Sequence, residues 1–180
     1  MSFTVVLPTE YPLTLLACTI LTVECFMLGP LLIGPARFRA FPKEFMDQFK
    51  EEHESAFPGS EPAVGGFPDC GDGRYSKKLD YKSWVEFNNA MRVHQNFVES
   101  LPLMLVILLV AGLYFPFATA AVGLFNTFTR LVYICMYVKK GSDARVIGAV
   151  AGSGPLYLLG LITFGAMVME AFKDESQVSL

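Results

Sequence analysis

The sequence predicts an all-α integral membrane protein, a bundle of four transmembrane helices, on two observations. Of the 180 residues, 53% are hydrophobic and only 17% are charged, which is more apolar surface than a soluble domain of this size can bury. The apolar residues gather in four long runs, each of roughly 20 residues or more, the length needed to cross a bilayer. We expect antiparallel, left-handed packing of the four helices, as in most membrane bundles.

The four expected spans are residues 11–36, 83–114, 117–138 and 146–169. Only Phe115 and Pro116 separate the second span from the third, so these two helices form an antiparallel hairpin. Gly148 and Gly152 place a pair of small residues four apart in the fourth span, a pattern that favours close packing against a neighbouring helix.

A long polar loop, residues 40–81, is expected between the first and second spans. Its first part, 43–57, mixes phenylalanines with charges after Pro42. This pattern predicts either a short helix on the membrane surface or a disordered segment. Residues 58–73 contain five Gly and three Pro, which predicts turns.

The basic residues predict the topology. Of the 14 Lys and Arg, 13 lie within residues 37–92 and 130–145. The positive-inside rule then puts both loops, 40–81 and 139–145, in the cytosol and both termini on the other side.

Composition argues against two other classes of protein. A net charge of -3 without a long basic run disfavours nucleic-acid binding. The four cysteines form neither a C-x-x-C pair nor a disulfide framework, so we expect no structural metal. The first twelve residues lack Lys and Arg, so the first apolar segment is expected to be retained rather than cleaved as a signal peptide.

Three polar residues stand where the second span enters its apolar run. Arg92, Asn96 and Glu99 are spaced i, i+4 and i+7, which places them on one helix face over about 10 Å. We call these three residues the ladder. Residues 100–129 contain no Asp, Glu, Lys or Arg, and polar groups at such a boundary are costly and usually functional.

A second polar face is predicted on the third span, where Arg130, Tyr133 and Tyr137 are spaced i, i+3 and i+7. Both faces open toward the cytosol in the expected topology. Together with Arg37 and Arg145 they would suit a small anionic ligand that carries carboxylates and an amine. The alternative is that these residues make structural contacts between helices, with arginines reaching to the membrane interface.

The stretch Arg92-Val-His-Gln-Asn96-Phe-Val-Glu99 resembles the Arg-x-x-x-Asn-x-x-Glu motif on the second helix of the membrane-associated proteins in eicosanoid and glutathione metabolism, the MAPEG family. Arg130-Leu-Val-Tyr133-Ile-Cys-Met-Tyr137 and the basic loop after it are also similar. The resemblance extends over all four spans. It implies a homotrimer of four-helix subunits in a microsomal or endoplasmic reticulum membrane, with glutathione bound between neighbours near the cytosolic face.

The resemblance also implies roles for individual residues. The implied glutathione-binding residues are Arg37, Arg92, Asn96, Glu99, Arg130, Tyr133 and Tyr137. An arginine after the third helix polarises the sulfur in such proteins, and here it would be Arg145, with Lys139 or Lys140 as alternatives. The chemistry is reasonable, because a guanidinium beside a thiol favours the nucleophilic thiolate. No metal is implied.

Three features depart from the family pattern. Ser100 stands where the leukotriene-making members have a tyrosine ligand, which removes one expected contact. The loop 40–81 is longer than the usual first loop and is expected either to cover the site or to bind something else. His94, two residues from Arg92, is expected to point away from the ladder in a structural role.

The resemblance leads to one principal function and two alternatives. The principal function is a glutathione transferase acting on lipophilic electrophiles that arrive through membrane lipid, with peroxidase activity on lipid hydroperoxides left open. The alternatives are a non-enzymatic lipid-binding scaffold of the same fold and leukotriene C4 synthase-like conjugation of a lipid epoxide. A transporter is disfavoured because residues 103–125 contain no Asp, Glu, Lys, Arg or His.

Overall fold

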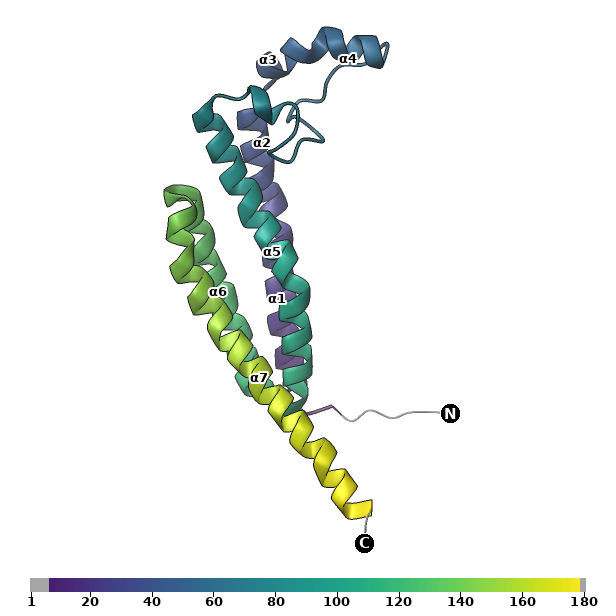
Figure 1. The fold of residues 1–180 in the computed structure, drawn as a ribbon, viewed down its shortest axis with the longest axis vertical. Coiled ribbons are helices and arrows are strands. Elements are labelled where there is room, and N and C mark those ends of the chain that lie inside the picture. Colours follow the sequence, from purple (N-terminus) through teal and green to yellow (C-terminus); the bar gives the residue numbers. More distant parts are fainter. Residues whose placement is uncertain (1–6, 179–180) are drawn as a thin grey trace.

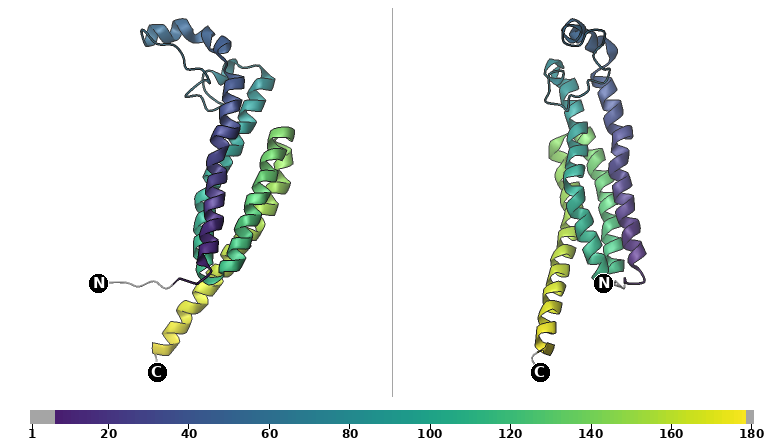
Figure 2. Two further views of the ribbon diagram at one scale, coloured as in Figure 1. Left: turned by 180° about the vertical axis from the view of Figure 1, so that it is seen from behind. Right: turned by 90° about the vertical axis from the view of Figure 1, so that its right-hand side faces the viewer.

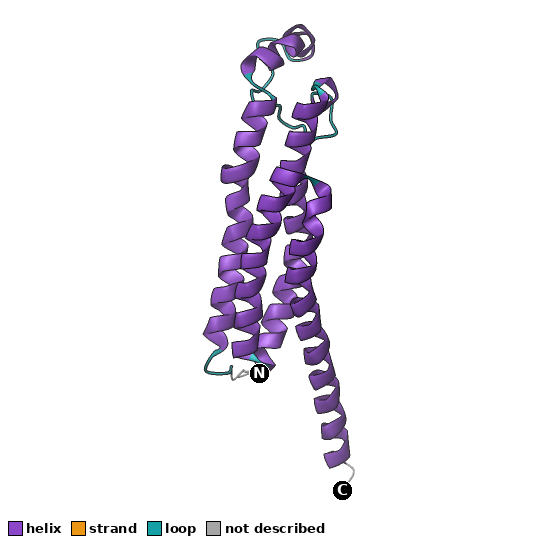
Figure 3. Cartoon of the chain, turned by 90° about the vertical axis from the view of Figure 1, so that its left-hand side faces the viewer, coloured by secondary structure: helices purple, strands orange, loops and turns teal. Residues whose placement is uncertain are grey.

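The structure is a computed structural model that describes residues 7–178, except for the side chains of Arg145, Ile147 and residues 173–178. The described chain is helical and contains no strand (Figure 3). In order, its elements are α1 (Tyr11–Leu28), η1 (Gly29–Ile33), α2 (Gly34–Ala40), α3 (Lys43–Met46), η2 (Asp47–Phe49), α4 (Lys50–Ala56), η3 (Ser76–Lys78), α5 (Tyr81–Tyr114), α6 (Pro116–Lys140), η4 (Ser142–Ala144) and α7 (Arg145–Val178).

Four helices of the described chain are long and apolar enough to cross a membrane, as the sequence predicts. The first runs from Tyr11 to Ala40, because α1 continues through a π-helical turn, η1, into α2. The second and third extend the expected spans by two residues or fewer at each end. The fourth continues past residue 169, since the polar tail remains helical.

The two polar loops lie at one end of the bundle. Figure 1 shows the loop between α2 and α5, together with α3 and α4, beyond the end of the bundle that also carries the α6–α7 turn. The α5–α6 turn, the start of α1 and the end of α7 lie at the opposite end (Figures 1 and 2). The chain therefore has the up-and-down arrangement that the counting of basic residues requires.

Local sequence explains where these helices begin. Asp80 caps α5, because its carboxylate accepts a hydrogen bond from the backbone N–H of Ser83 at 3.1 Å. The Ser83 hydroxyl, together with this backbone N–H, holds the pKa of Asp80 below its usual value. Pro116 is the first residue of α6, where a missing N–H costs nothing. The segment after Pro42 is helical, as α3, η2 and α4, which agrees with the expected short helix rather than with a disordered segment.

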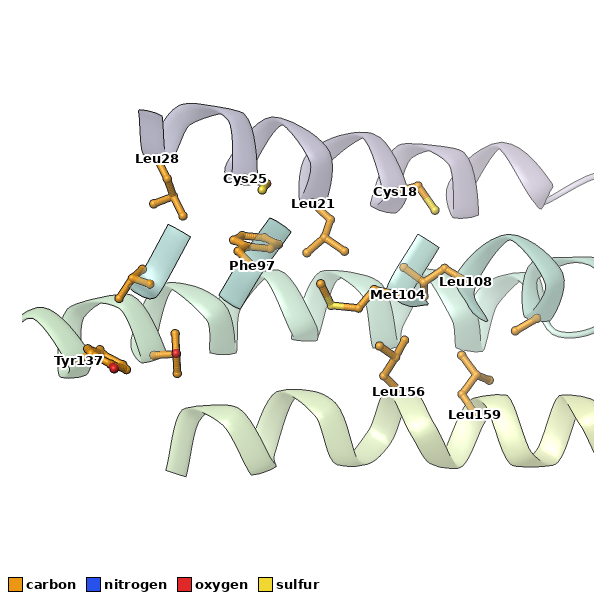
Figure 4. Packing of buried hydrophobic residues seen from close by; sticks show 13 residues of the cluster. Cys18, Leu21, Cys25, Leu28, Phe97, Met104, Leu108, Tyr137, Leu156 and Leu159 are labelled. Carbon is orange, nitrogen blue, oxygen red and sulfur yellow. The ribbon is translucent and has the colours of Figure 1, made fainter. Parts of the chain in front are cut away.

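Apolar side chains from all four long helices form the core (Figure 4). Leu21 of α1, Leu108 of α5 and Leu156 of α7 are almost completely buried. The predicted close packing by glycine is confirmed between α6 and α7, because a Cβ on Gly148 would lie 2.9 Å from the Cα of Tyr133. This close contact brings the polar residues of α6 within reach of α7.

Candidate functional site

Two hollows flank the polar part of α5. The larger is an open groove of about 550 Å³ between α5 and the polar loop; its lining residues are Cys70, Asp72, Asn88, Met91, Arg92, His94, Gln95, Val98 and Glu99. The smaller, of about 130 Å³, lies between α5, α6 and α7 and is lined by Asn96, Ser100, Arg130, Tyr133, Gly148, Ala149, Gly152, Ser153 and Tyr157. We call them the groove and the cavity.

The ladder is divided between the two hollows. Arg92 and Glu99 line the groove, and Asn96 lines the cavity. Gln95 connects the two charged residues, because its side-chain oxygen accepts from Arg92 Nη1 at 3.4 Å and its nitrogen donates to Glu99 Oε1 at 2.9 Å. Successive residues turn by about 100° on a helix, so Gln95 and Asn96 fall on opposite sides of the line from Arg92 to Glu99.

Gln95 is therefore a polar residue that the sequence analysis missed. It stands three residues after Arg92 and four before Glu99, and these two spacings are the ones that bring helical side chains together. The spacing rule applied to amides as well as to charges would have found it.

Arg130 has its own partners at the edge of the cavity. Its Nη2 donates to the hydroxyl of Ser100 at 2.6 Å, and its guanidinium carbon lies 4.8 Å from the ring centroid of Phe97. Ser100 donates in turn to the backbone oxygen of Asn96 at 2.7 Å. Ser100 thus links α5 to α6 through this arginine.

The two tyrosines of α6 are buried rather than open to the groove. Their rings pack edge to face with centroids 5.6 Å apart, and both belong to the core. Tyr133 also lines the cavity, next to Arg130, whereas Tyr137 lines neither hollow. In the single chain, the expected second polar face therefore has Arg130 and Tyr133 at the cavity and Tyr137 in the core.

Arg37 lies under the polar loop. It is 5% exposed, its Nη1 donates to the backbone oxygen of Gly65 at 3.2 Å, and its guanidinium carbon is 4.4 Å from the ring centroid of Phe67. It lines neither the groove nor the cavity. The structure therefore does not bring Arg37 together with the ladder, and its contact with a ligand stays a prediction.

The residue predicted to polarise a thiol begins α7. Arg145 is the first residue of that helix, and its side chain lies outside the described residues. The competing Lys139 and Lys140 are exposed in the last turn of α6. All three stand at the end of the bundle that carries the polar loop (Figure 1), and the choice among them stays open.

Residues 69–73 form the second wall of the groove, and a buried carboxylate closes this turn. Asp69 accepts hydrogen bonds from the backbone N–H groups of Gly71 at 2.8 Å, Gly73 at 3.1 Å and Ser76 at 2.7 Å, and from the Ser76 hydroxyl. Burial by itself would raise the pKa of Asp69, but these hydrogen bonds outweigh it and hold the pKa below its ordinary value. We call residues 69–73 the loop wall.

The loop wall is fixed to α5 at the Gly71 carbonyl. That oxygen accepts from Trp84 Nε1 at 3.2 Å and from Asn88 Nδ2 at 2.9 Å. Gly71 has a φ of +111°, and a Cβ there would lie 2.8 Å from Asn88 Oδ1, so glycine suits this position on both counts. The long loop thus forms one wall of the groove, and the two expectations for it, that it covers the site or binds something else, stay predictions.

His94 also lines the groove, and the expectation that it points away from the ladder stays a prediction. The groove covers a broad face of α5. Arg92 and His94, about 160° apart on a helix, stand at its two rims with Gln95 between them. No cluster of three or more His, Cys, Asp or Glu side chains suited to a metal ion occurs among the described residues.

A comparison with protein-family models matches residues 14–165 to the model described as the MAPEG family. The match includes the whole of α5 and α6, the loop wall, and most of α1 and α7. Both hollows therefore lie within the matched region.

Proposed function

This chain belongs to the MAPEG family, and from that premise we propose that it is a membrane-bound glutathione S-transferase. The family includes glutathione transferases, peroxidases and synthases that use glutathione. The Arg92-Val-His-Gln-Asn96 version of the motif resembles that of microsomal glutathione S-transferase 3, which favours the transferase branch. The proposed second substrate is a lipophilic electrophile or a lipid hydroperoxide that reaches the site through the bilayer.

The observation that supports this proposal best is the pair of charged residues on the groove side of α5. Arg92 and Glu99 are exposed, and among the described residues neither forms an ion pair. Charged residues at the entrance to an apolar helix are rare and usually functional. Glutathione carries carboxylates for Arg92 and an ammonium group for Glu99, whereas a protein that only presents lipid has no need of either residue.

The proposed chemistry is thiolate attack. A free thiol has a pKa of about 8.5 and is mostly protonated at neutral pH, so a cation beside the sulfur favours loss of its proton to solvent. The sulfur lone pair then forms a bond to the electrophilic carbon, and the leaving group departs with its electron pair. We assign the cation to Arg145, with Lys139 and Lys140 as competitors.

The proposed assembly is a homotrimer with glutathione between neighbouring subunits. In the single chain the ladder opens onto two separate hollows, so a ligand that met Arg92, Asn96 and Glu99 together would need further walls. A second subunit would supply them. In this proposal Arg37, Arg130, Tyr133 and Tyr137 complete the glutathione site.

We place both polar loops in the cytosol, with the protein in the endoplasmic reticulum membrane. Cys70 is exposed in the loop wall, so a membrane-impermeant thiol reagent should label it in sealed microsomes from the cytosolic side, and a Cys70→Ser variant should lose that label. Labelling of Cys70 only after the vesicles are opened would invert this topology.

Isothermal titration of the detergent-solubilised protein with glutathione tests the proposed function. Saturable binding, followed by turnover with a lipophilic aryl halide or a lipid hydroperoxide, would support the transferase or peroxidase reading. Absence of binding would contradict it and leave the lipid-binding scaffold. An apolar hollow of about 180 Å³ between α5 and α7, lined by Val106, Ile107, Val110, Gly160, Thr163, Phe164 and Met167, keeps that alternative physically reasonable.

A further inference from the structure

The loop wall brings a charge to the groove that the family motif does not contain. Asp72 is exposed, lines the groove with Arg92 and Glu99, and makes no hydrogen bond or ion pair within the described chain. The charged lining of the groove is thus one guanidinium and two carboxylates, with His94 at the far rim.

This set of charges matches one end of glutathione better than the other. The γ-glutamyl end carries an ammonium group and a carboxylate on the same carbon, whereas the glycine end carries a carboxylate alone. A guanidinium that shares a groove with two carboxylates can bind both charged groups of the γ-glutamyl end. At the glycine end, the same two carboxylates would only repel.

We propose that Asp72 is a specificity-determining residue of the groove, which selects thiol peptides with a free α-ammonium group at the γ-glutamyl end. The inference rests on the proposed glutathione function and adds to it a residue outside the Arg-x-x-x-Asn-x-x-Glu motif. Asp72 binds the ammonium group directly, so its effect depends on that group and disappears when the ligand lacks it.

Hydrogen bonds fix the backbone of the turn that carries Asp72. Asp69 ties the turn together from one side of Asp72, and the neighbouring Gly71 carbonyl is held to α5 by Trp84 and Asn88. A side chain on backbone that is already held in position needs less ordering of the loop when a ligand binds. An exposed aspartate on an untethered loop would not have this advantage.

Glu99 is the competing partner for the same ammonium group. One of its oxygens already accepts from Gln95 at 2.9 Å, whereas neither oxygen of Asp72 is engaged by a described residue. Two carboxylates can bind one ammonium group together, because an ammonium has three donors. The test must therefore measure the contribution of Asp72 separately from that of Glu99.

A comparison of two ligands and three proteins makes this separation. Full-length protein in detergent is titrated calorimetrically with glutathione and with its analogue in which the α-amino group is replaced by hydrogen. The proteins are wild type, Asp72→Asn, and the control Glu51→Gln, which removes one negative charge from the exposed face of α4, outside the groove. Thermal unfolding of each variant establishes that it is folded.

We expect wild type and Glu51→Gln to prefer glutathione over the analogue by the same factor. Asp72→Asn should reduce that preference roughly fivefold, the effect of about one charge-assisted contact near solvent, and should bind the analogue as wild type does.

The other possible results distinguish failure of the inference from failure of the proposed function. If wild type binds glutathione and Asp72→Asn keeps the full preference, the inference is wrong and the proposed function stands. An equal weakening of both ligands would assign Asp72 to loop structure and would also overturn the inference. Failure of wild type to bind glutathione would refute the proposed function and the inference with it.

Discussion

The two hollows beside α5 hold arginines in opposite situations. Arg130, at the cavity, is half-buried and already donates to Ser100 while its guanidinium lies over Phe97. Arg92, at the groove, is exposed, and among the described residues it hydrogen-bonds to the neutral Gln95 alone. The first arginine ties two helices together in the absence of ligand, and the second leaves most of its donors for a ligand. One residue type thus serves two roles on the two sides of one helix.

The two hollows also differ in what forms their walls. The cavity lies between membrane helices that glycines allow to approach closely, whereas the groove has a polar turn as its outer wall, held by Asp69 and by the Gly71 carbonyl. We therefore expect changes at the cavity to affect stability first and changes at the groove to affect binding first.

The largest binding effect should come from Arg92→Ala. It removes a charge-assisted contact to a ligand carboxylate, worth about 1.5 to 3 kcal/mol, which is roughly a 10- to 150-fold loss of glutathione affinity. The melting temperature should change little, because no buried partner loses a contact. Arg39→Ala, an exposed arginine outside the groove, is the calorimetric control. Normal glutathione binding by Arg92→Ala would make the ladder structural.

Gly148→Ala should destabilise the protein by about 1 to 3 kcal/mol, as overpacking of a tight core does. The new Cβ would lie 2.9 Å from the Cα of Tyr133, so backbone has to move. Gly154→Ala is the matched control on the same helix, since its Cβ would have no neighbour within 4 Å. Thermal melts in one detergent compare the two, and equal melting temperatures would refute close packing of α6 on α7.

Arg145→Ala should separate catalysis from binding. Glutathione affinity should stay within a few-fold, because the ligand carboxylates remain bound, and turnover at pH 7 should fall roughly tenfold, since one pKa unit corresponds to about 1.4 kcal/mol. Turnover should partly recover as pH rises, because the thiol then ionises without help. Wild-type turnover across the whole pH range would transfer the role to Lys139 or Lys140.

The smallest expected effect is a loss of loop-wall stability at acid pH. The folded pKa of Asp69 is lowered relative to that of the unfolded chain, about 3.9. Its stabilising contribution is therefore fully present above that pH and is lost as pH falls through the lower, folded value. Trp84, the only tryptophan, reports on the Gly71 contact, so its fluorescence should change in that acid window. Asp69→Asn should lack this transition, and an identical acid transition in the variant would assign it to another group.

The four membrane-spanning helices could be predicted from the sequence because hydrophobic length is a local property of the chain. The two residues Phe115 and Pro116 were enough to predict the tight turn between α5 and α6. Gly148, four residues before Gly152, was enough to predict close helix packing. Helical spacing likewise predicted that Arg92 and Glu99 share one face of α5, and both line the groove.

The candidate site was less predictable because its decisive contacts join distant residues. Nothing near Asp69 in the chain indicates that Gly71 would be held by Trp84, or that Asp72 would line the groove. The resemblance made Arg37 a glutathione-binding residue, whereas in the structure it donates to a backbone carbonyl of the loop, at Gly65. Buried polar contacts of this kind depend on how the loop folds over the helices, which periodicity does not encode.

The central claim is that the site binds glutathione and ionises its thiol, and ultraviolet absorbance of the thiolate tests it most directly. Wild-type protein saturated with glutathione at pH 7 should develop a thiolate band that S-methylglutathione, which has no ionisable thiol, does not produce. Arg92→Ala should reach the same band only at higher glutathione concentration. Saturable binding of glutathione without a thiolate band, or an equal spectrum with the methylated ligand, would contradict the account.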